Sequence, residues 1–311
     1  FTVCDFACGS GTLLSATYEA LLSKYHKECF DKNMQPNFKE FHKDMLEYSI
    51  WGFDALEYAT QIASIVLSLR EPGVPLKKMN MYSIPIDEKG TLGSLNLWWS
   101  NMLLLPIKRK SISKTESLLL RVPKFNLIIM NPPFSRTTAP GKEGSRPRIF
   151  DFITDKEVFE KLWEAYKRLI RDMENELKRD NRIKENYEEC IKQQKIFRPQ
   201  DVNPLNAGAA FPFVILATRY LVDGGRLALV LPKTVIENAA FFFLRLLLLS
   251  HYDIEYIVIS SEPGNPNFSY STGFSEILLV ARKNTKVEKR NNKTYIIDFK
   301  VQPKTTLEGI L

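Results

Sequence analysis

Residues 1–13 read FTVCDFACGSGTL and predict a strand, a turn and a helix in that order. Strand formers fill residues 1–6, residues 7–11 are all small, and residues 12–22 place apolar side chains at helical spacing. Glycines at a strand-to-helix turn let a ligand approach the backbone closely, and the amino end of the helix offers N–H groups without intrahelical partners. This order is typical of nucleotide-binding α/β folds. A tight turn that binds nothing is the alternative.

A second short strand is predicted at residues 50–54, and it ends in Asp54. An acid at the end of the second strand of a doubly wound fold hydrogen-bonds ribose hydroxyls, so Asp54 is the candidate ribose ligand. Capping of the helix expected from Ala55 to residue 69 is the alternative role, and the two are compatible. We expect the core-facing side of that helix to carry Ala59, Ile62, Ala63, Val66 and Leu69.

The stretch NPPF at residues 131–134 follows the apolar run of residues 126–130. A short apolar run bounded by a proline pair predicts a buried strand that ends in a rigid turn. Ligands of open α/β sheets bind at the carboxyl ends of strands, which makes Asn131, Pro132, Pro133 and Phe134 candidate catalytic residues. The plainer alternative is that the proline pair only ends a strand.

The segments between these motifs give less specific signals. A third strand is expected at residues 79–86, where Asn80 is a candidate contact to a ligand. Residues 90–110 are predicted to be irregular, with Trp98 and Trp99 as a packed lid rather than a base-stacking platform. Residues 135–148 form a basic loop that could contact phosphates through Arg136, or could simply be solvated.

The second half of the chain predicts further helices and the remaining strands. A capping box of Thr154 and Glu157 starts a long amphipathic helix, and residues 151–200 are expected to be a helical insertion packed on the core rather than a DNA-binding helix. A helix is expected at residues 207–221, with Pro212 in its first turn. The run GGRLALVLP at 224–232 predicts a buried strand, and residues 254–260 and 276–281 an antiparallel pair. Phe268, between those two strands, is a candidate contact to a substrate base.

Composition limits the class of protein without naming it. The chain has 311 residues, of which 44% are hydrophobic and 25% are charged, as in ordinary globular proteins. It has no apolar run long enough to span a bilayer and no signal peptide, so we expect a cytoplasmic protein. Four cysteines without a C-x-x-C pair and three histidines give no zinc pattern, and no metal is expected. The formal charge of +7 is compatible with a polyanionic partner.

The motif of residues 5–13, DFACGSGTL, resembles the S-adenosylmethionine-binding motif of DNA adenine methyltransferases, and it is close to the form in type I restriction-modification subunits. The NPPF turn and the run at residues 224–232 resemble the same family. The resemblance implies an α/β fold with a doubly wound, mainly parallel seven-stranded sheet, an antiparallel end strand and a helical insertion. It implies S-adenosylmethionine as cofactor, held by Asp5, Ala7, Cys8, Gly9, Ser10, Gly11, Thr12, Asp54, Ala55 and Asn131. Asp5 and the backbone of residues 9–11 would lie against the methionine part.

The four residues of the NPPF turn suit methyl transfer to the N6 amine of adenine, a poor nucleophile. If the Asn131 side chain and the Pro132 carbonyl each accept one N6–H, the nitrogen lone pair is directed at the methyl group without a strong base. A base must leave the duplex to reach such a site, and Phe134 would stack on the flipped base. Arg136 and Phe268 are further candidate contacts to DNA.

The resemblance also implies what accompanies residues 1–311, which would be a methyltransferase core. Phe1 already lies inside a predicted strand, so we expect the native N terminus upstream, together with a helical region and a separate target-recognition domain. The partners would be DNA, a specificity subunit and a restriction subunit, in a restriction-modification or phage-defence system. Two alternatives remain: a methyltransferase of RNA or of protein glutamine, and a non-catalytic scaffold in a DNA-binding assembly.

Overall fold

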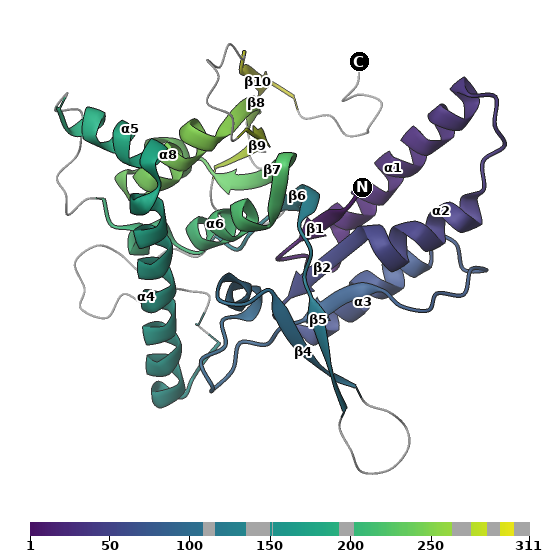
Figure 1. Cartoon of the computed structure of the whole chain (residues 1–311), viewed down its shortest axis with the longest axis horizontal. Helices are drawn as coiled ribbons and strands as arrows, with labels where there is room; N and C mark the ends of the chain where they lie inside the picture. The colour runs from purple at the N-terminus through teal and green to yellow at the C-terminus, as the bar shows by residue number, and fades with distance from the viewer. Residues whose placement is uncertain are drawn as a thin grey trace.

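An eight-stranded sheet forms the centre of the chain (Figure 1). The structure is a computed structural model that describes residues 1–107, 116–134, 150, 152–192, 202–262, 275–284 and 293–301. The strands of the sheet are β1 (Val3–Asp5), β2 (Ile50–Asp54), β3 (Asn80–Ser83), β6 (Phe125–Met130), β7 (Leu221–Pro232), β8 (Tyr252–Ser260), β9 (Glu276–Lys283) and β10 (Tyr295–Phe299). Their order across the sheet is β10-β8-β9-β7-β6-β1-β2-β3. The remaining two strands, β4 (Met102–Ile107) and β5 (Glu116–Arg121), form a separate antiparallel hairpin that projects from the body of the chain.

Helices cover both faces of the sheet, as in a doubly wound fold (Figure 1). One side carries α1 (Thr12–Asp31), α2 (Phe38–Asp44), the π-helix η1 (Met45–Ser49) and α3 (Glu57–Ser68). The other side carries α4 (Lys156–Arg179), α5 (Asn181–Lys192), α6 (Ala210–Tyr220) and α8 (Phe242–His251). The short helices are η2 (Gly93–Trp98), η5 (Pro204–Ala207), α7 (Thr234–Glu237) and η6 (Ala239–Phe241).

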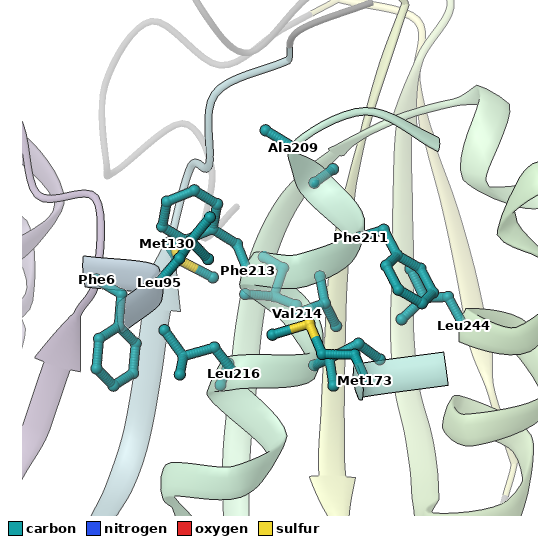
Figure 2. Close-up of a cluster of buried hydrophobic side chains, with 14 of the residues drawn as sticks. Phe6, Leu95, Met130, Met173, Ala209, Phe211, Phe213, Val214, Leu216 and Leu244 are labelled. Carbon is teal, nitrogen blue, oxygen red and sulfur yellow. The ribbon is translucent and has the colours of Figure 1, made fainter. Parts of the chain in front are cut away.

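Side chains along the central strands point alternately to the two faces of the sheet, so the hydrophobic core has two parts, one on each face. In β6, Leu127 and Ile129 pack on the α1 side, whereas Ile128 and Met130 pack on the α6 side. Figure 2 shows residues of the larger part, where Met130 of β6 lies beside Phe213 of α6. The strands are therefore buried on both faces, which holds their carboxyl ends in fixed positions.

The fold class expected from the sequence is confirmed, with two differences in the sheet. Within the described residues the sheet has eight strands instead of seven, because β10 pairs in parallel with β8 at the edge. The antiparallel strand is not at the end of the sheet: β9 lies between β7 and β8 and runs antiparallel to both.

Several predicted elements are confirmed in kind but differ in extent. Strand β2 has the expected bounds, α6 starts two residues before Pro212, and α1 continues to Asp31. The segment expected to be irregular, 90–110, contains η2 and β4 within its described part. The apolar face of α4 packs on the core as predicted, but the predicted N-cap residue is wrong by one position. Asp155, not Thr154, accepts the Glu157 and Val158 N–H groups, at 2.8 and 3.0 Å.

The predicted inner face of α3 is partly wrong. Ile62 and Leu69 are 43% and 62% exposed, whereas Ala63 and Leu67 are fully buried. The helix is apolar around most of its circumference, so helical spacing alone does not select the buried side. Close packing against the glycine turn selects the side with small residues.

Candidate functional site at the carboxyl edge of the sheet

The glycine turn and the NPPF turn leave the sheet at the same edge. Strand β1 lies between β2 and β6 and is parallel to both, and Cys4 pairs with Ile128 in the register of β1 and β6. Neighbouring strands are about 4.8 Å apart. The turns that follow β1 and β6 therefore start side by side, as a shared ligand site requires.

Hydrogen bonds fix the glycine turn to the ends of β1 and β2. The Ala7 N–H donates to Oδ1 of Asp5 at 2.9 Å, and the Cys8 N–H donates to the Phe53 carbonyl at 2.9 Å. From the α6 side, the buried Ser94 hydroxyl donates to the Phe6 carbonyl at 2.6 Å. Nothing in the sequence around Ser94 indicated this contact, because a single serine in an irregular segment has many possible roles.

The two glycines of the turn have different roles. Gly9 has φ +51°, and an added Cβ would meet no atom within 4 Å, so the space in front of it is open. Gly11 has φ +82°, and its Cβ would lie 2.8 Å from Cβ of Ala63 on α3. Gly11 is therefore required for packing against α3, whereas the open space at Gly9 leaves room for a ligand. The cofactor contacts expected of both glycines stay predictions.

Asp54 joins the glycine turn to the segment before α3. Its Oδ2 accepts the Gly9 N–H at 2.8 Å and its Oδ1 accepts the Leu56 N–H at 2.9 Å. A carboxylate has about four acceptor positions, so each oxygen retains one for a ligand hydroxyl. The N-cap residue of α3 is Leu56, so Asp54 is not the cap considered as an alternative. The carboxylate is half-buried and fixed in orientation before any ligand binds.

Asp5 is a buried acid beside the turn. It is 1% exposed, and burial raises its pKa to about 8, with the negative charge of Asp54 adding to the rise and the Ala7 N–H opposing it. The carboxyl group is therefore mostly protonated at neutral pH, and a cation bound nearby would favour its ionised form. Burial also raises the pKa of the neighbouring Cys8 thiol, which excludes a thiolate at neutral pH.

These residues fit the cofactor that the resemblance implied. Ser10 and Thr12 are exposed, while Ala7, Gly9 and Ala55 are half-buried. Helix α1 has no side-chain cap at its amino end, so its first N–H groups can receive a carboxylate. Open space at Gly9, acceptor positions on Asp54 and an acid poised to ionise match a ligand with an amino acid part and a ribose.

The NPPF turn has no regular secondary structure and begins where β6 ends. Met130 is fully buried (Figure 2), Pro132 is buried and Pro133 is exposed, whereas Asn131 and Phe134 are half-buried. The core thus anchors the turn while two side chains keep accessible surface. Arg136 and Phe268 lie outside the described residues.

Asn80 is not at this edge. It is the first residue of β3, and its Nδ2 donates to the Glu47 carbonyl at 3.1 Å while its Oδ1 accepts the Tyr82 hydroxyl at 3.2 Å. The prediction that Asn80 contacts a ligand is therefore wrong. Ser83 pairs with Asp54 and ends β3 at the carboxyl edge, a register that could not be read from the sequence.

Strand order and the internal antiparallel strand give the chain the fold of class I S-adenosylmethionine-dependent methyltransferases. No protein-family model and no curated protein matches the sequence. Solved structures with a similar fold include the ATP-dependent type ISP restriction-modification enzyme LlaBIII bound to DNA, with 11% identity and a TM-score of 0.54. Others are a nuclease-deletion mutant of the type ISP enzyme LlaGI with a DNA substrate mimic (12%, 0.51) and the DrdV–DNA complex (13%, 0.50). Each similarity covers 96% of this chain but only 17%, 21% and 24% of those chains, respectively.

Proposed function

We propose that this chain transfers methyl from S-adenosylmethionine to the N6 amine of adenine in DNA, within a restriction-modification or phage-defence system. The observation that carries the proposal is the position of the two turns, side by side at the carboxyl ends of β1 and β6. The similar solved structures bound to DNA, named above, have the same fold and support the proposal at that level.

The glycine-turn side of the site would hold the cofactor. Asp54 would accept the ribose hydroxyls with the acceptor positions that Gly9 and Leu56 leave free. The amino end of α1 would receive the carboxylate of the methionine part. Bound there, the cofactor supplies an electrophilic methyl group on a sulfonium. The positive charge of the sulfonium and ammonium would favour the ionised form of Asp5.

The NPPF side would hold the target amine. The Asn131 side chain and the Pro132 carbonyl would each accept one amine hydrogen, which directs the nitrogen lone pair at the methyl group. Burial of the end of β6 supports the proposal, because it would hold both acceptors in place before the reaction. Phe134 would stack on a base that has left the duplex. A specificity subunit and a restriction subunit would complete the assembly.

The test is methyl transfer by the full protein from cofactor labelled in the methyl group. DNA, ribosomal RNA and a glutamine-bearing release factor would be offered as competing acceptors. The proposal predicts label in DNA, recovered as N6-methyladenine. It also predicts a loss of about a hundredfold or more in rate for Asn131→Ala, the scale for removing a hydrogen bond aligned with the transition state. Asn181→Ala, an exposed asparagine at the start of α5, is the matched control.

Label in RNA or in the release factor would show that the acceptor is RNA or protein instead of DNA. Those acceptors also present an amine or amide nitrogen that is a poor nucleophile because its lone pair is delocalised. No label in any acceptor, with equal cofactor affinity in both variants and the parent, would refute it and favour the non-catalytic scaffold.

A further inference from the structure

A hollow lies at the opposite, amino edge of the sheet, and the proposed methyl transfer does not use it. We call it the amino-edge hollow. Its volume is about 660 Å³, and its lining residues are 97–101, 121–124 and 219–220. Its lining residues lie at the base of the β4–β5 hairpin, just before the start of β6. Strand β6 separates it from the NPPF turn by its whole length, about 20 Å for six residues.

Two tryptophans form the aromatic side of the amino-edge hollow. Trp98 is 5% exposed and belongs to the core, as expected for a packed lid, but Trp99 is 42% exposed. The Trp99 indole N–H donates to Oδ2 of Asp172 at 3.0 Å, and Arg168 lies over the ring at 5.9 Å from its centroid, so the ring is held in one orientation. A partly exposed indole held in one orientation is a surface on which a planar group can stack.

Three cations line the same hollow, and no acidic residue is among its described lining residues. Arg219 lies over the Trp98 ring, 4.3 Å from its centroid, and is 3.5 Å from Glu176. Arg121 and Lys124 are exposed and form no ion pair with any residue that the structure describes. Two of the three cations, Arg121 and Lys124, therefore have no acidic partner in the part of the chain that the structure describes.

The pKa of one half-buried lysine near the hollow is affected by Lys124 as well as by its own burial. Lys283, which donates from Nζ to the Thr218 and Leu221 carbonyls at 2.8 and 3.0 Å, has a lowered pKa. Burial is the main cause, and the positive charge of Lys124 is the second, opposed by Asp223. Removing water from cations that already repel one another is unfavourable unless an anion joins them.

We propose that the amino-edge hollow binds a nucleotide unit, with its phosphate on Arg121 and Lys124 and its base stacked on Trp99. The chemistry favours a ligand that is both anionic and planar, because cations and an aromatic face are presented together. A volume of about 660 Å³ is within the range of small-molecule sites and exceeds what a bare phosphate fills. The unit could be a free nucleotide or part of a single strand. The proposal is independent of the methyl transfer reaction.

The test uses the full protein with its cofactor added at saturating concentration, so that the cofactor side of the carboxyl-edge site is occupied. Binding at the NPPF side is distinguished from binding at the hollow because only the latter depends on Arg121 and Lys124. Calorimetry would measure binding of adenosine monophosphate, adenosine, inorganic phosphate and a short single-stranded oligonucleotide. We expect the monophosphate to bind more tightly than adenosine or phosphate. We also expect the double variant Arg121→Gln with Lys124→Gln to weaken monophosphate binding about tenfold or more, as loss of charge-assisted hydrogen bonds does.

Matched variants separate the contributions that positive charge and the Trp99 ring make to the binding affinity. Lys27→Gln with Lys39→Gln removes the same charge from exposed positions on α1 and α2 and should leave binding unchanged. Trp99→Leu should weaken the monophosphate but not inorganic phosphate. If the oligonucleotide binds more tightly than the monophosphate and loses affinity in the same variants, the natural ligand is a strand; the reverse order indicates a free nucleotide.

The proposal is overturned if neither the monophosphate nor the oligonucleotide loses affinity in the Arg121 and Lys124 double variant. Inorganic phosphate or polyglutamate binding as tightly as the monophosphate would also overturn it, because the base would then contribute nothing. Methyl transfer is read separately by label in the acceptor, so loss of one activity leaves the other measurable.

Discussion

Replacing Gly11 by alanine should destabilise the protein more than replacing Gly9 by alanine, although the two glycines are two residues apart in one motif. Both have positive φ, +82° at Gly11 and +51° at Gly9. They differ in surroundings, because a Cβ at Gly11 would lie 2.8 Å from Cβ and 3.1 Å from Cα of Ala63, whereas a Cβ at Gly9 meets nothing within 4 Å. The comparison therefore isolates packing from backbone strain.

The magnitudes follow from those two effects. A left-handed backbone costs a residue with a Cβ about 1–2 kcal/mol, and this applies to both positions. Overpacking adds about 1–3 kcal/mol at Gly11, where the obstructing atoms include backbone that cannot rotate away. We expect losses of about 2–5 kcal/mol in the free energy of unfolding for Gly11→Ala and about 1–2 kcal/mol for Gly9→Ala.

Urea unfolding of the two variants measures these losses, and calorimetry with the cofactor measures the second half of the prediction. At Gly9 the new methyl group enters the space where a ligand approaches, so cofactor affinity should fall more than stability does. Equal losses of stability in the two variants would show that Gly11 is not a packing residue. Unchanged cofactor affinity in Gly9→Ala would show that the open space at Gly9 is not part of the site.

Three further predictions concern the acids around the fold. Asp54→Asn replaces one acceptor oxygen by an NH₂ group and should weaken cofactor binding about tenfold by calorimetry, the scale of one hydrogen bond to a charged group; unchanged affinity would contradict its role. The pKa of Asp5 is raised to about 8, so the native state keeps a proton that the unfolded chain releases above about pH 4. The free energy of unfolding should therefore fall, relative to that of Asp5→Asn, as the pH rises from 4 to 8. Parallel urea-unfolding free energies across that range would contradict this. Asp155→Ala should cost about 1 kcal/mol in thermal unfolding and Thr154→Ala almost nothing, and the reverse order would restore the predicted cap.

The sequence predicted the fold class and the carboxyl-edge motifs because both depend on local chemistry. Strand β2 was predicted with its observed bounds, since apolar strand formers end at an acid. The small-residue turn and the proline turn each mark the end of a strand, so their residues could be located without knowing which strands are neighbours. Parallel pairing of β1 with β6 then brought the two turns together.

Features that depend on tertiary contacts were missed. The exposed side of α3 could not be predicted, because both sides of the helix are apolar and only the contact between Gly11 and Ala63 selects one. The position of Asn80 at the wrong end of β3 reflects register, which depends on pairing with Trp51. The amino-edge hollow brings together residues about 120 positions apart in the chain, so no local sequence pattern predicts it.

Described helices of this chain include none that is long and apolar enough to cross a bilayer.

The central claim is that the glycine turn and the NPPF turn form one site for two substrates. A crystal structure of the protein with a cofactor analogue that cannot transfer methyl tests this most directly. We predict the ribose hydroxyls at Asp54, the amino acid part over Gly9, and the atom that replaces the methyl group directed toward Asn131. An analogue bound at the amino edge, or bound with that atom directed away from Asn131, would contradict the claim.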